Sequence, residues 1–134
     1  MIRPVLPGLA DEMVAAIAVE VPDYARAMEG TFGQMVRLGV EVALNRFVDM
    51  VADPSIDVTG ARDTYVNLGR GEFHAGRSLD ALLAAYRVGA RLAWRSFVEA
   101  GTAGGLRPEA MYSLGEAIFA YIGEISAESA DGYA

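Results

Sequence analysis

Three arginines, Arg87, Arg91 and Arg95, stand four residues apart in the stretch GRSLDALLAAYRVGARLAWRSF. On an α-helix this spacing places them within about 80° of one side. Like charges at this spacing repel one another, so something must offset them. Such a row of guanidinium groups suits an anionic ligand, a seam of ion pairs with a neighbouring helix, or a solvated edge.

Two chemical roles follow for this row. In the first, an anionic metabolite is held by Arg87, Arg91 and the aromatic residues beside them, Tyr86 and Trp94. In the second, Arg87 and Arg91 are architectural and pair with acidic residues of two other predicted helices. Those acids are Glu41 and Asp49 in one helix, and Glu109, Glu116 and Glu124 in the other. We favour the architectural role and keep the ligand site as the alternative.

The remaining reactive residue types form no catalytic pattern. His74 is the only histidine, and it lies two residues before Gly76, where a cation favours the end of a helix. There is no cysteine, and the serines Ser78, Ser96 and Ser113 stand in no GxSxG nucleophile motif. We therefore predict no catalytic residues, no metal site and no cofactor, and a protein that is not an enzyme.

Composition narrows the class of protein. The 134 residues suffice for one domain, residues 1–134, and 53% of them are hydrophobic. A net charge of −7, with every basic residue an arginine, argues against nucleic-acid binding by this chain. No apolar run is long enough to span a membrane, and MIRPVLPGLADE lacks the apolar core of a signal peptide. We expect a cytoplasmic protein with no membrane contact.

Proline, glycine and capping residues predict the elements that position these side chains. Ser78 is placed to cap the arginine-bearing helix, Gly76 to end the helix before it, and Pro108 to open the last one. No segment alternates as a strand does, so the fold class is all-α, a single bundle of about five to six helices. Residues expected to face inward in the third helix are Tyr65, Leu68 and Phe73. The predicted helices are Leu9–Glu20, Asp23 to about Ala52 with a break near Gly30, about Thr59 to Ala75, the helix after Ser78, and Pro108 toward Asp131.

Small residues recur in the arginine-bearing helix. Ala85, Gly89 and Ala93 are four residues apart, which predicts close approach of a neighbouring backbone at Gly89.

The last predicted helix carries a regular apolar seam. Leu114, Ile118, Tyr121 and Ile125 follow one another at spacings of three and four residues. The hydrophobic surplus of the chain favours an oligomer, and two-fold dimers are the commonest. We therefore predict a homodimer whose interface includes these four residues, together with the Leu9–Glu20 helix.

The stretches LGRGEFHAGRSLDALLAAYRVGARLAWR and EAIFAYIGEISAESADGYA resemble the N-terminal domain of actinobacterial PucR-type transcriptional regulators. That domain is similar to the N-terminal domain of RsbR/RsbRD-type co-antagonists of the stressosome kinase. The resemblance extends from about Val21 to Ala134 and is tightest between Leu68 and Arg95. The matching positions are Gly69, Arg70, Gly76, Arg77, Leu79, Tyr86, Arg87, Gly89, Arg91 and Trp94.

The resemblance implies a cytoplasmic sensory or dimerisation domain, globin-like without haem in its stressosome relatives. It implies no catalytic role and places this domain before further regulatory regions and a C-terminal helix-turn-helix. This chain shows no such DNA-binding region, so DNA contact is not assigned to it. We expect a regulatory input domain whose partners are a second copy, downstream domains of a full-length regulator and a small-molecule effector.

Overall fold

The computed structural model describes residues 6–24, 30–52 and 62–134. Within those ranges the chain is helical and contains no strand, which confirms the predicted all-α class. The elements are α1 (Leu6–Glu20), a short 3-10 turn η2 (Pro22–Tyr24), α2 (Thr31–Ala52), α3 (Arg62–Ala75), α4 (Leu79–Ala103) and α5 (Pro108–Tyr133).

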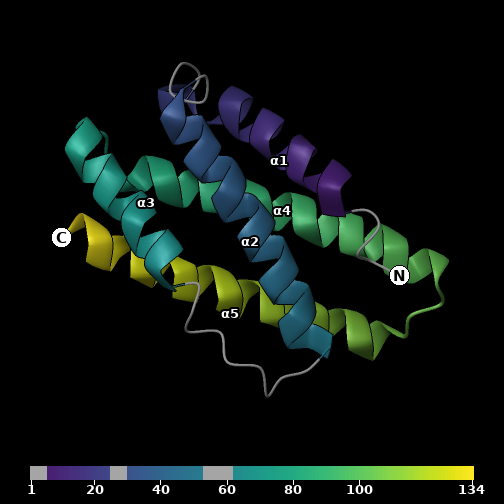
Figure 1. Cartoon of the computed structure of the whole chain (residues 1–134). Helices are drawn as coiled ribbons and strands as arrows, with labels where there is room; N and C mark the ends of the chain where they lie inside the picture. Colours follow the sequence, from purple (N-terminus) through teal and green to yellow (C-terminus); the bar gives the residue numbers. More distant parts are fainter. Residues whose placement is uncertain (1–5, 25–29, 53–61) are drawn as a thin grey trace.

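The two longest helices form the base of the bundle. α4 and α5 run antiparallel, and α1, α2 and α3 lie across one face of this pair (Figure 1). α1 packs on α4 and α2, and α3 crosses the C-terminal half of α5 (Figure 1). This layering gives α4 and α5 one face toward the core and one face away from it.

The predicted helix boundaries are set by local chemistry. The Ser78 hydroxyl accepts a hydrogen bond from the Ala81 amide at 3.3 Å and caps α4. Gly76 adopts a left-handed φ of 75° and ends α3. There the Gly76 amide donates to the Phe73 carbonyl and the Arg77 amide to the Glu72 carbonyl, both at 3.1 Å, which is a Schellman motif. Pro108 opens α5, where its missing amide hydrogen costs nothing.

Two sequence predictions need correction, one at the start of the second predicted helix and one in α3. The helix predicted from Asp23 to about Ala52 does break near Gly30 as expected, since α2 begins at Thr31, but its first part, at Pro22–Tyr24, is a 3-10 turn and not an α-helix. Residues 25–29, and the predicted start of the third helix near Thr59, lie outside the described residues. Phe73 was predicted to face inward, but it is 58% exposed, whereas Tyr65 and Leu68 are buried.

Close backbone approach occurs between α3 and α5, and not at Gly89. A Cβ added to Gly69 would lie 1.8 Å from the Ser129 carbonyl oxygen, and one added to Gly132 would lie 1.9 Å from the Val66 carbonyl oxygen. At Gly89 the nearest such contact is an ordinary 3.8 Å to the Met13 sulfur. The crossing of α3 over α5 therefore requires glycine on both helices.

Candidate functional site

The arginine row lies on the outside of the bundle. Arg87, Arg91 and Arg95 are all exposed. Arg91 donates to the Glu20 carboxylate at the end of α1, and this hydrogen bond lowers the pKa of Glu20. The predicted partners on α2 and α5 were therefore wrong for Arg91, because the outward side of α4 borders α1. Arg87 makes no ion pair with the described part of the chain.

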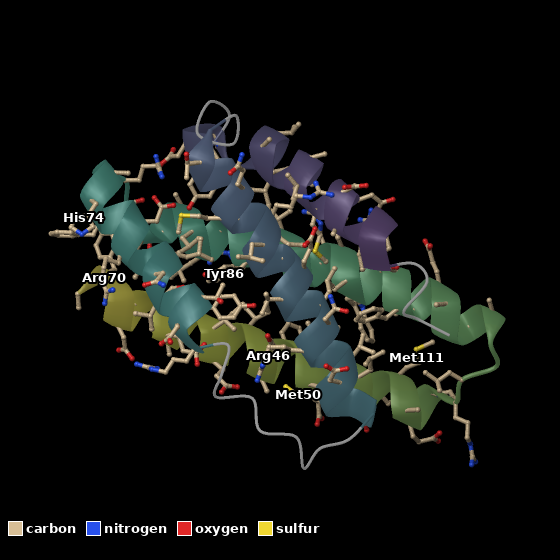
Figure 2. The ribbon with its side chains drawn as sticks, viewed as in Figure 1. Arg46, Met50, Arg70, His74, Tyr86 and Met111 are labelled. Atoms are coloured by element: carbon tan, nitrogen blue, oxygen red, sulfur yellow. The ribbon has the colours of Figure 1, made fainter. Side chains whose placement is uncertain are left out.

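The four residues of the hypothetical anion site do not share one site. Tyr86 turns into the bundle, where its hydroxyl lies 2.6 Å from the Ser129 hydroxyl (Figure 2). Trp94 lies against α5, with ring carbons 3.2 and 3.3 Å from the position of a Cβ at Gly115. Since Arg91 pairs with α1 and Arg87 faces solvent, the geometry does not assemble a pocket for an anion from this set.

A cavity of about 90 Å³ lies at the centre of the bundle. All five α-helices contribute to its wall, which is almost wholly apolar. Aromatic rings define part of it: Phe47 stacks on Phe97 with centroids 5.7 Å apart, and Tyr121 meets Phe47 edge-on at 6.0 Å. An empty apolar cavity costs about 24 cal/mol per Å³, which is on the order of 2 kcal/mol here.

The polar atoms in this wall are already hydrogen-bonded to protein. The Tyr65 hydroxyl donates to the Gly39 carbonyl at 3.1 Å, and the Ser129 hydroxyl donates to the Tyr65 carbonyl at 2.8 Å. Because Ser129 has a single hydroxyl hydrogen, Tyr86 must be the donor in its contact with Ser129. Among the side chains that the structure describes, no buried nitrogen or oxygen lacks a partner. Burial raises the pKa of Tyr65, Tyr86 and Tyr121, so all three stay neutral.

A second polar cluster, which the sequence did not reveal, lies where α3 ends. Glu72 is 0% exposed, and its carboxylate accepts hydrogen bonds from the Tyr24 hydroxyl and from Arg77 Nε at 2.6 Å. Arg77 also lies over the Tyr24 ring, 5.6 Å from its centroid, and its carbonyl accepts from the Tyr133 hydroxyl at 2.9 Å. The cluster ties η2 and α5 to the α3–α4 turn. The Schellman motif at Gly76 turns the chain back so that Arg77 reaches Glu72. The spacing of Glu72, Gly76 and Arg77 is the feature of the sequence from which this ion pair could have been predicted.

The predicted dimer residues of α5 point inward. Leu114, Ile118, Tyr121 and Ile125 are all buried against the other helices of the same chain. The apolar seam was thus correctly recognised, but it forms the core and not an exposed surface. The outward side of α5 carries Tyr112, 71% exposed, and Phe119, 78% exposed, on either side of Gly115. With Trp94, these residues form what we call the α4–α5 aromatic patch.

His74 is at the outer end of α3 and points away from the bundle (Figure 2). It is exposed and lies outside the cavity. Within residues 6–24, 30–52 and 62–134, no three His, Asp or Glu side chains gather in a way that could hold a metal ion. None of the described helices is both long and apolar enough to cross a membrane.

Comparison with known proteins agrees with the resemblance seen in the motifs around Gly69, Gly76 and Arg77. The family model of the PucR-like N-terminal domain matches residues 1–134. No curated protein and no solved structure matches the chain. Because the family model covers the full length, the chain belongs to the PucR-like N-terminal domain family.

Proposed function

We propose that this chain is the input domain of a PucR-family regulator and that it works as a homodimer held together by the outer face of α4 and α5. The family match supports the regulatory class. The proposal includes no catalytic step. It also includes no DNA contact by residues 1–134, because a net charge of −7 is unsuitable for binding DNA. Its partners are a second copy and downstream domains of the regulator.

The observation that carries the dimer is the α4–α5 aromatic patch. α1, α2 and α3 cover one face of the α4–α5 pair (Figure 1). Trp94, Tyr112 and Phe119 are exposed on α4 and α5. Two such pairs related by a two-fold axis would pack as a four-helix bundle, an arrangement in which each aromatic patch covers the other. Large aromatic side chains of this kind are enriched at interface centres.

Light scattering of the purified chain tests the proposal. We expect a mass of twice 14.2 kDa at micromolar concentration. Phe119→Glu should give a folded monomer, because it places a carboxylate at the centre of the interface. The matched control is Val19→Glu, since Val19 is 81% exposed on α1 and lies outside the patch. A monomer before mutation, or a dimer that survives Phe119→Glu, would contradict the proposal.

Glutamate at the inward positions does not test the interface. Ile118→Glu and Ile125→Glu would bury a charge in the core, so either variant loses the fold before it reports on association.

The anionic-ligand alternative receives no support from the described geometry. Its four residues face different surroundings, and Arg91 already has a carboxylate partner in Glu20. We do not propose an anion site at these positions.

A further inference from the structure

We propose that the central cavity is a binding site for a small, neutral, apolar molecule, no larger than about a benzene ring. The proposal goes beyond the dimer and does not depend on it. It rests on the volume of the cavity, on the chemistry of its wall and on its place in the bundle.

The wall selects against water. An ordered water molecule needs two to four polar partners, and an apolar cavity without them stays dry. Here the hydroxyl hydrogens of Tyr65 and Tyr86 are directed to the Gly39 carbonyl and to Ser129, and Ser129 donates to the Tyr65 carbonyl. The polar groups nearest the cavity are thus satisfied by protein atoms, and little is left for water to bind.

The wall also selects against charged ligands. Among the described residues that line the cavity there is no arginine, aspartate or glutamate, and the hydroxyl groups of Tyr65, Tyr86 and Tyr121 are the only polar groups on its side chains. A carboxylate or ammonium group placed there would lose its hydration without gaining a partner. This excludes the anionic metabolite as the occupant of this cavity.

The volume sets the size of the ligand. A cavity of about 90 Å³ exceeds the space that one water needs and is smaller than an engineered apolar cavity of roughly 150 Å³ known to bind benzene and xenon. Xenon therefore fits without rearrangement, and a single six-membered ring is the upper limit. The flexible side chain of Met13 in the wall allows small adjustments to the shape of a ligand.

A smaller cleft adjoins the cavity and indicates the side of entry. It is bordered by Arg46 and Met50 of α2, which Figure 2 labels, and by Glu124 and Glu128 of α5. Tyr65, Tyr121 and Ile125 line both spaces, so these side chains form the partition between them. The entry route that we propose therefore passes between α2, α3 and α5, at these side chains.

The first experiment uses the unmutated protein with xenon and with benzene as probes. Methyl NMR spectra should show saturable shifts for cavity residues such as Leu82, Ile118 and Ile122, and none for the exposed Val19. Benzoate, which has the same ring and a negative charge, should cause no saturable shift at these methyls. Absent or uniform shifts with xenon and benzene would overturn the site, and equal binding of benzoate would overturn the ligand class.

The second experiment fills the cavity. Ala90→Leu adds a larger side chain at the wall, and Ala84→Leu is the matched control, because Ala84 is equally half-buried on α4 but does not line the cavity. Benzene binding should weaken on the order of tenfold or more in Ala90→Leu and stay unchanged in Ala84→Leu. Equal binding by the two variants would overturn the assignment. If Ala90→Leu does not fold, the methyl shifts of the unmutated protein decide.

Discussion

Removing Arg77 tests whether the Glu72 cluster holds the end of α3 in place. Glu72 is fully buried and Arg77 is 21% exposed, so Arg77→Met leaves a carboxylate that has lost its charged partner. Breaking a buried pair from one side costs about 3–5 kcal/mol. Tyr24 still donates to Glu72, and Arg77 is partly hydrated, so we expect a loss near the lower end, about 3 kcal/mol.

A double-mutant cycle separates the ion pair from packing. In Glu72→Met/Arg77→Met the buried carboxylate is gone, and the chief remaining cost is the lost hydrogen bond between the Tyr24 hydroxyl and Glu72, about 1–3 kcal/mol. The double variant should therefore be more stable than Arg77→Met alone, which is a strong departure from additivity. This sign is opposite to what loss of side-chain packing would produce.

Urea unfolding followed by circular dichroism at pH 7 measures all four corners of the cycle. Arg91→Met is the control, because it removes the same side chain from the exposed pair with Glu20 and should shift the midpoint far less. The reasoning would be refuted by additive single effects, or by an Arg77→Met loss no larger than that of Arg91→Met.

Three further predictions follow from the described geometry. Gly69→Ala should destabilise by about 1–3 kcal/mol or more, because its Cβ would overlap the Ser129 carbonyl, whereas Gly71→Ala, with open space around it, should be neutral or stabilising in thermal melts. Burial and the nearby Glu124 raise the pKa of Glu128, so ionisation of Glu128 at neutral pH destabilises the native state. Glu128→Gln should therefore increase stability at pH 7 and leave it unchanged in acid, where Glu128 is protonated in both states. Equal stability of the two proteins at pH 7 would contradict this. Burial also raises four tyrosine pKa values above the usual 10, so stability should fall as pH rises beyond 10. The phenolate absorbance of these residues should appear only on unfolding. A smooth titration of all six tyrosines in the folded protein would contradict this prediction. These four are Tyr24, Tyr65, Tyr86 and Tyr121.

The sequence by itself determined the helices and most of their ends. The Ser78 cap, the Gly76 terminator and the Pro108 start are short-range features, in which a residue acts on backbone within about one turn. The inward seam of Leu114, Ile118, Tyr121 and Ile125 was also visible, since helical periodicity shows which residues share a side. The resemblance to the PucR-type N-terminal domain was carried by the motifs around Gly69, Gly76 and Arg77, and the family model confirms it over residues 1–134.

Tertiary structure alone decided what each side faces. Periodicity shows that one side of a helix is apolar, but not whether that side packs against the same chain or against a second copy. For this reason the sequence analysis placed the dimer interface on the side of α5 that in fact faces the core. Arg91 pairs with Glu20, 71 residues away in sequence, and Glu72 accepts from Tyr24, 48 residues away; no local pattern specifies these two contacts, in contrast to the pair of Glu72 with Arg77. The cavity likewise has no sequence signature, because it arises from the angles at which five helices cross and from the space their side chains leave unfilled.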